Sequence, residues 1–292
     1  MVALPAVDIR RAVHMGLEED LGQGDITTGA LFSEPIPAHA RIIAQQPLVV
    51  AGMAAAIQTF IAVDASLKLT PSLRDGSHAK HGDVLLQIEG DGRSILMAER
   101  VALNFLQYLS GIATLTSRFC QAVHGYPVEI MDTRKTLPGW RAIQKWAVSL
   151  GGGRNHRVSL GDGILIKDNH LALMNKKKPA VLSACRKARA LASKDKPVIV
   201  EVESLPEVQA ALRGKADIIL LDNMTPTTVK QAVRLIKGRA LVEVSGGITL
   251  KNVRAMAVAG PDRISIGALT HSAPAATISL ILEPRRRRRR AS

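Results

Sequence analysis

The first 115 residues combine two hydrophobic rhythms. Apolar side chains recur at four-residue spacing over residues 8–19, which predicts a helix. A second helical pattern, longer and with one apolar face, covers residues 94–118. Three short apolar runs, separated by proline and Gly-Asp turn signals, predict strands at residues 40–44, 48–50 and 84–88. These elements predict an N-terminal α/β sandwich domain over residues 1–115.

From about residue 126 the rhythm changes to short apolar runs that alternate with helical segments. The runs lie at Val128–Met131, Gly163–Ile166, Val198–Val202, Ile218–Leu221, Leu241–Val244 and Arg263–Ile266. Helical patterns follow three of them, at Leu205–Leu212, Thr227–Lys237 and Leu250–Ala259. This alternation is typical of a parallel sheet built from βα units, and six units in a row favour a barrel that is closed or nearly so. We expect an α/β barrel catalytic domain over residues 116–269, with residues 270–284 packing back on the first domain and residues 285–292 as a disordered basic tail.

Polar residues follow each of these apolar runs. In a parallel barrel the carboxyl ends of all strands meet on one rim, where enzymes of this architecture place their active sites. A structural protein has no reason to load every strand end on one rim with charge. The rim residues expected from this pattern are Asp132, Thr133, Arg134, Lys135, Lys167, Glu201, Asp222, Asn223, Ser245, Gly246, Gly247, Gly267 and Ala268.

Two glycine-containing turns follow the last two predicted strands. Ser245-Gly246-Gly247 ends one strand and opens a helix, and Gly267-Ala268 ends the next. Glycine lets backbone N–H groups approach an anion closely, and the N-terminus of a helix favours negative charge. Either turn alone is explained by tight chain reversal. Because the loops after the last two strands of a barrel often bind phosphate, the two together favour a phosphate site.

Three cations directly end predicted strands, namely Arg134, Lys135 and Lys167. Cations at neighbouring strand ends repel one another unless anions fill the site. Arginine is also the natural bidentate partner of a carboxylate. We interpret glycines 151–153 as a flexible turn that lets His156 and Arg157 reach the same rim. The pattern favours a compact ligand with several negative charges.

Two acids, Glu201 and Asp222, end neighbouring strands on the same rim. Paired carboxylates among cations can hold a divalent metal that bridges phosphates, or stabilise a developing positive charge. The alternative is that they form ion pairs with the lysines. We favour a catalytic or metal-binding role.

The chain of 292 residues has a formal net charge of +14, which favours anionic partners. Six of these charges are the arginine run 285–290, so the rest of the chain still carries about +8. A solvated end, native or appended by cloning, accounts for such a run. The sequence shows no helix-turn-helix, zinc module or aromatic-studded sheet, so it does not favour specific nucleic-acid binding.

The pattern does not indicate membrane insertion or secretion. Residues 42–63 are uncharged, but glutamine, proline and glycine interrupt them, whereas a span needs about 20 mostly apolar residues. Asp8 and Arg10 interrupt any signal-peptide pattern at the N-terminus. Cys120 and Cys185 match neither metal-ligand nor redox spacing and are typical of thiols in a reducing compartment. We therefore expect a cytoplasmic protein.

An ordered set of motifs resembles quinolinate phosphoribosyltransferases, the carboxylating nicotinate-nucleotide pyrophosphorylases. No single short motif carries the resemblance, which covers nearly the whole chain. Its motifs are EDLGQGDITT (Glu19–Thr28), AERVALNFLQYLSGIAT (Ala98–Thr114), DTRKTLPGWR (Asp132–Arg141), GGGRNHR (Gly151–Arg157), ILIKDNH (Ile164–His170), VEVES (Val200–Ser204), LLDNM (Leu220–Met224), EVSGGI (Glu243–Ile248) and GALTHS (Gly267–Ser272).

The resemblance implies an N-terminal α/β sandwich joined to an open or incomplete α/β barrel, in a homodimer, or a hexamer, with shared active sites. It implies that quinolinate meets Thr133, Arg134, His156, Arg157 and Lys167, with Arg100 supplied by the partner subunit. It implies that phosphoribosyl pyrophosphate meets Lys135, Lys167, Asn223, Ser245, Gly246, Gly247, Gly267 and Ala268. Lys135, Glu201 and Asp222 would be catalytic, with the two acids near Mg²⁺ and the ribose.

The reaction implied is transfer of a phosphoribosyl group to quinolinate with decarboxylation, giving nicotinate mononucleotide for NAD biosynthesis. Two alternatives stay open at this point. One is a paralogue of the same fold that acts on nicotinate or another substrate. The other is a non-catalytic nucleic-acid-binding protein, motivated by the arginine tail, which is not a feature of the family.

Overall fold

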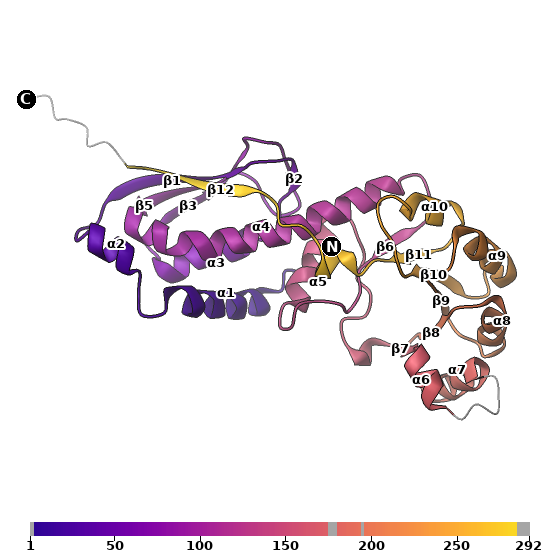
Figure 1. Ribbon diagram of the computed structural model, residues 1–292. Coiled ribbons are helices and arrows are strands. Elements are labelled where there is room, and N and C mark those ends of the chain that lie inside the picture. The colour runs from indigo at the N-terminus through magenta and orange to yellow at the C-terminus, as the bar shows by residue number, and fades with distance from the viewer. Residues whose placement is uncertain (1–2, 175–179, 194–195, 285–292) are drawn as a thin grey trace, which may run out of the picture. The chain divides into compact units, whose positions relative to one another are not determined.

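The computed structural model describes residues 3–174, 180–193 and 196–284. They form two compact units (Figure 1). The first unit contains Met1–Ser117, Leu137–Gly152 and Ser272–Ser292, and the second contains Arg118–Thr136 and Gly153–His271. Residues 137–152 thus group with the first unit, whereas the sequence boundaries placed them in the barrel. The basic tail at 285–292 lies outside the described residues.

The first unit is a layered α/β structure. Its antiparallel sheet has the order β12-β1-β5-β3, and β2 and β4 form a separate pair. The strands are β1 (Pro37–Ala44), β2 (Leu48–Val49), β3 (Lys68–Pro71), β4 (His78–Ala79), β5 (Val84–Asp91) and β12 (Ile278–Pro284). The helices are α1 (Ala6–Leu21), α2 (Ile26–Leu31), α3 (Met53–Val63), α5 (Arg141–Leu150) and α4 (Gly92–Ala122), which begins in this unit.

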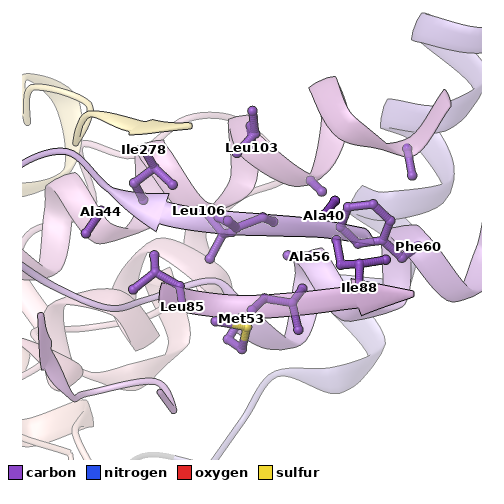
Figure 2. Close-up of a cluster of buried hydrophobic side chains, with 14 of the residues drawn as sticks. Ala40, Ala44, Met53, Ala56, Phe60, Leu85, Ile88, Leu103, Leu106 and Ile278 are labelled. Atoms are coloured by element: carbon purple, nitrogen blue, oxygen red, sulfur yellow. The ribbon is translucent and has the colours of Figure 1, made fainter. Parts of the chain in front are cut away.

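Alternation along β1 from Pro37 to Ile42 sets which face of this sheet is buried. Ala40 and Ile42 are buried, whereas Arg41 between them is exposed and meets Glu283 of β12. The buried face packs against α3 and α4, as Figure 2 shows for Phe60 and Leu106. Because neighbouring side chains of a strand point to opposite faces, one polar face and one apolar face follow directly from the sequence.

The second unit is built on a parallel sheet of six strands in the order β6-β11-β10-β9-β8-β7. The strands are β6 (Glu129–Met131), β7 (Ile164–Ile166), β8 (Val198–Val202), β9 (Ile218–Asp222), β10 (Leu241–Ser245) and β11 (Arg263–Ser265). The helices of this unit are α6 (Asp168–Leu173), α7 (Ala180–Leu191), α8 (Leu205–Arg213), α9 (Pro226–Ile236), α10 (Val253–Val258) and α11 (Ala268–His271). The two edge strands do not pair with each other in the described structure, so the barrel is open. This confirms the predicted α/β fold with a sandwich and an incomplete barrel.

The register of the parallel strands aligns their carboxyl ends. Glu201 of β8 pairs with Leu220 of β9, and Asp222 pairs with Ser245 of β10. Most of the remaining residues of β8, β9 and β10 are buried Val, Ile or Leu. The apolar runs are therefore used for burial between sheet and helices, and polar side chains gather where the strands end.

The predicted absence of a membrane span can be compared with the helices of the described ranges. None of them has both the length and the hydropathy that crossing a bilayer would require. The uncharged stretch 42–63 forms the end of β1, the short β2 and the amphipathic helix α3.

Candidate active site

A cavity of about 530 Å³ lies within the second unit, at the carboxyl ends of its strands. Residues from every strand end of the sheet contribute to its wall. The predicted site residues that line it are Thr133, Arg134, Lys135, His156, Arg157, Lys167, Glu201, Asp222, Ser245, Gly246, Gly247, Gly267 and Ala268. The structure thus brings together residues that are up to 135 positions apart in the chain.

Two predicted site residues do not line this cavity. Arg100 lies on α4 in the first unit, where it is exposed. Asn223 is exposed next to Asp222, where its Nδ2 donates to Asp222 Oδ2 (2.7 Å) and its backbone N–H donates to the Ser245 carbonyl (2.9 Å). Gly246 passes so close that a Cβ there would lie 2.2 Å from Asn223 Oδ1. Asn223 therefore braces the wall, and Gly246 is required by that close approach.

The segment that carries His156 and Arg157 is held against the free edge of β6. Arg154 forms an isolated parallel bridge with Met131, and its backbone N–H donates to the Ile130 carbonyl (2.8 Å). Asp132, which is fully buried, accepts from the His156 backbone N–H (2.8 Å) and from Asn155 Nδ2 (2.7 Å). The strand end thereby fixes where the next two residues enter the cavity.

The cationic wall of the cavity, formed by Arg134, Arg157 and Lys167, contains polar atoms that have no hydrogen-bond partner in the protein. Within the described structure, Nε of Arg134 and Nε of Arg157 are buried and have no hydrogen-bond partner. Burial lowers the pKa of the Arg157 guanidinium, and the neighbouring Arg134 lowers it further. A buried donor without an acceptor is costly, and two guanidinium groups repel each other. A ligand carboxylate would relieve both penalties.

The cationic wall also borders a second cavity of about 450 Å³ in the same unit. Arg134, Arg157, Leu165 and Lys167 line both cavities. The positive charge therefore spans more space than one small anion fills, which suits a site for two anionic substrates.

The acids of the wall occupy neighbouring strands, and one is paired. Lys167 Nζ lies 3.0 Å from Glu201 Oε2, so the ion pair considered from the sequence is present. The lysine side chain is 47% exposed, and pairs this open to solvent are weak enough for a ligand to displace. Within the described residues, no group of three His, Cys, Asp or Glu side chains could hold a metal by itself. Mg²⁺ is commonly held by one or two carboxylates together with substrate phosphates, which Glu201 and Asp222 can provide.

The two glycine turns also line the cavity. Gly246 and Gly247 both have positive φ values, +91° and +60°, which side chains other than glycine rarely adopt. At the next strand end, a Cβ on Gly267 would lie 3.1 Å from Lys135 Cδ. Thr270 Oγ1 donates to the Lys135 carbonyl (2.7 Å) and secures that residue beside the turn. Lys135 is therefore held beside the Gly267 turn.

Comparison with known proteins identifies the family. Residues 25–110 match the family model of the quinolinate phosphoribosyl transferase N-terminal domain, and residues 112–281 match that of its C-terminal domain. The chain belongs to the quinolinate phosphoribosyltransferase family. A probable nicotinate-nucleotide pyrophosphorylase [carboxylating] of Bacillus subtilis is 38% identical over 274 residues, covering 94% of this chain and 93% of the relative. One from Methanocaldococcus jannaschii is 40% identical over 279 residues, covering 92% of this chain and 95% of the relative.

Solved structures of the family share the fold closely. A nicotinate-nucleotide pyrophosphorylase from Francisella tularensis superposes with a TM-score of 0.90 at 37% identity, over 96% of this chain and 98% of that one. The human nicotinic acid phosphoribosyltransferase gives a TM-score of 0.57 at 12% identity, which shows a shared fold alone. The resemblance stated from the motifs is confirmed, and the chain is an enzyme of this family.

Three polar residues line the cavity without having been predicted, namely Glu243, Ser265 and His271. Glu243 is fully buried within β10. A signal for it was available, because a charged residue inside an otherwise apolar strand is rarely buried without a role. Ser265 and His271 carry no comparable signal in the sequence.

Proposed function

We propose that this chain transfers the phosphoribosyl group of phosphoribosyl pyrophosphate to the ring nitrogen of quinolinate. The products are nicotinate mononucleotide, pyrophosphate and carbon dioxide, and the reaction belongs to NAD biosynthesis. The single observation that best supports this is the cavity wall of the second unit, which joins unpaired guanidinium donors to two glycine turns. Membership in the family supports the same reaction.

The cationic wall suits the two carboxylates of quinolinate. Arg134, Arg157 and Lys167 provide three positive charges, and Thr133 and His156 lie on the same wall. The unpaired Nε–H groups of both arginines can donate to carboxylate oxygens. Nicotinate has one carboxylate fewer, so it would leave buried charge unpaired, which costs several kcal/mol.

The glycine turns suit phosphoribosyl pyrophosphate. Ser245, Gly246, Gly247, Gly267 and Ala268 would bind its phosphates through backbone N–H groups, with Asn223 bracing the turn. Lys135, fixed beside these turns, would meet the pyrophosphate, and Lys167 would leave Glu201 to join it. Binding of both substrates therefore uses each cation of the wall.

Glu201 and Asp222 would stabilise the positive charge that develops on the ribose as pyrophosphate leaves. The same two residues would hold Mg²⁺, which when bound neutralises charge on the pyrophosphate. The quinolinate nitrogen forms the new bond to the ribose carbon and becomes cationic. The bond from ring carbon C2 to its carboxylate then breaks, its electron pair stays on the ring, and that carbon takes a proton from solvent. The protein contributes mainly positioning and electrostatic stabilisation.

We also propose a homodimer in which Arg100 of each subunit serves the site of the other, and a cytoplasmic location. The resemblance supports the dimer. Two free cysteines are consistent with a reducing compartment. Burial raises the pKa of both Cys120 and Cys185 to about 11, which disfavours the reactive thiolate.

The reaction is tested with quinolinate labelled with ¹³C in its C2 carboxylate. Incubation with phosphoribosyl pyrophosphate and Mg²⁺ should release labelled carbon dioxide, and omitting phosphoribosyl pyrophosphate or Mg²⁺ should abolish it. Unlabelled nicotinate in place of quinolinate should give no nucleotide. A nucleotide formed from nicotinate would instead establish the paralogue alternative. If neither quinolinate nor nicotinate gives a product, the proposed reaction is wrong.

The basic tail should be dispensable for catalysis. No residue assigned to the site lies beyond β12, so deleting residues 285–292 should leave turnover within about twofold. The deletion should also weaken any salt-sensitive RNA binding, because that binding depends on the number of cations. Steady-state kinetics and filter binding at two salt concentrations measure both effects. A folded deletion variant without activity would place the tail in the site.

A further inference from the structure

A buried carboxylate on the floor of the cavity has no role in the reaction described above. The side chain of Glu243 is fully buried, and it is a charged residue in the middle of the otherwise apolar strand β10. Its Oε1 lies 3.2 Å from His156 Nε2 and accepts from the Ser265 hydroxyl. Its Oε2 has no hydrogen-bond partner within the described structure. A buried carboxylate this sparsely paired is costly, so its retention calls for a function.

The neighbouring histidine is engaged by the protein at both ring nitrogens. Its Nδ1 accepts from the backbone N–H of Arg157 (2.8 Å), so the ring proton resides on Nε2 and points to Glu243. The side chain of His156 is only 10% exposed. A ring bound at both nitrogens has none left for a substrate carboxylate. His156 therefore connects Glu243 to Arg157 rather than reaching the ligand.

Glu243 also acts on Arg157 through space. Burial and Arg134 lower the pKa of that guanidinium, whereas Asp162 and, to a lesser extent, Glu243 raise it. Asp132 holds the His156 backbone from the other side. The backbone of Arg157 is thus held by a chain of contacts that begins at Glu243, while its guanidinium donates through Nη1 to the Gly163 carbonyl (3.0 Å). The repulsion between Arg157 and Arg134 is partly offset by Asp162 and Glu243.

We infer that Glu243 is a positioning residue for quinolinate: it acts through His156 to hold Arg157 at the carboxylate-binding wall, and His156 is not itself a ligand. This rests on the proposed function, because it assigns how that same site selects its dicarboxylate. The substrate affected is quinolinate: Glu243 shares β10 with the Ser245-Gly246-Gly247 turn, but its ionic contact is with His156, and the turn would bind phosphate through backbone N–H groups that Glu243→Gln retains. Glu243 should therefore govern quinolinate affinity and leave the affinity for phosphoribosyl pyrophosphate unchanged.

The test is a double-mutant cycle of Glu243→Gln and His156→Phe in the full-length enzyme. Glu243→Gln keeps the shape of the side chain and removes its charge, and His156→Phe removes both ring contacts. Each single variant should weaken quinolinate binding about 10-fold, which is the usual effect of losing a hydrogen bond to a charged group. The double variant should also be about 10-fold weaker, because residues that act through one another are not additive.

Quinolinate affinity is measured by calorimetry without the second substrate, and phosphoribosyl pyrophosphate with Mg²⁺ is titrated separately. Glu203→Gln is the matched control, because this exposed acid lies just beyond β8 and does not line the cavity. A weakening of about 100-fold in the double variant would show that His156 binds quinolinate independently and would overturn the inference. Equal weakening for both substrates would show a general loss of structure and would overturn it too. If the wild-type enzyme releases no carbon dioxide from quinolinate, the proposed function fails, whatever the variants do.

Discussion

Asp222→Asn should lower kcat about 100- to 1,000-fold, the usual range for losing one group that stabilises transition-state charge. The carboxylate ends β9 on the cavity wall, and Asn223 Nδ2 orients one of its oxygens (2.7 Å). Asparagine keeps the size and loses the charge. Because that charge matters most when the ribose becomes positive, quinolinate affinity should change less than about threefold. Single-turnover kinetics and equilibrium binding separate the two quantities.

Glu203→Gln again provides the matched control, since it removes an acid of the same barrel that lies outside the cavity. Its kcat should stay within about twofold of the wild-type value. The assignment of Asp222 is wrong if Asp222→Asn loses quinolinate affinity while its turnover is unchanged. In that case the carboxylate would serve the pyridine substrate rather than the ribose.

The position of the site was predictable from the sequence because burial and chemistry occupy different parts of each barrel unit. The middle of a strand such as Ile218–Asp222 is apolar because it is covered by helices, whereas its last residue faces the rim. Since parallel strands begin and end together, residues that end such runs must lie close in space. This physical rule predicted most of the polar residues that line the cavity at strand ends, and Ser265, the last residue of β11, is an exception.

Contacts made by single atoms were not predictable in the same way. Asp132 ends a strand like its neighbours, yet its side chain turns inward to hold Asn155 and His156. The pairing of Glu243 with His156 depends on a strand and a loop 87 positions apart. Periodicity reports which face of an element is buried, and it carries no information about which polar atoms meet across the core.

The boundaries of the first unit could not be predicted from the sequence for a related reason. Residues 137–152 follow a barrel strand end in sequence but group with the first unit. Trp140 stacks on Phe105 with ring centroids 5.0 Å apart, and Gln144 donates to the Tyr108 hydroxyl (2.5 Å). These long-range aromatic and amide contacts decide the grouping, and local pattern contains no trace of them.

Two inactive variants should restore activity to each other when they are refolded together. Arg100→Ala removes the cation that the partner subunit is proposed to supply, and Arg134→Ala removes one from the cavity wall. Each variant alone should lose more than about 100-fold in kcat/KM, because each leaves a substrate carboxylate unpaired. Both should remain folded, since Arg100 is exposed and Arg134 lies at a strand end.

Equal amounts of the two variants are unfolded, mixed and refolded. Random pairing makes about half of the dimers mixed, and a two-fold axis gives each mixed dimer one intact site and one doubly defective site. About a quarter of all sites should therefore recover, measured as carbon dioxide released per mole of chain. Mass spectrometry of the intact dimers counts the mixed species directly.

The matched control mixes Arg134→Ala with Lys167→Ala, two variants whose defects lie on the same cavity wall of one subunit. Every site in their mixed dimers keeps one defect, so this mixture should stay inactive although it contains as many mixed dimers. Recovery in the first mixture and none in the second can arise only if Arg100 crosses to the neighbouring subunit's site. Mixed dimers of Arg100→Ala and Arg134→Ala without activity would show that Arg100 acts within its own chain or not at all, and the shared site would have to be abandoned.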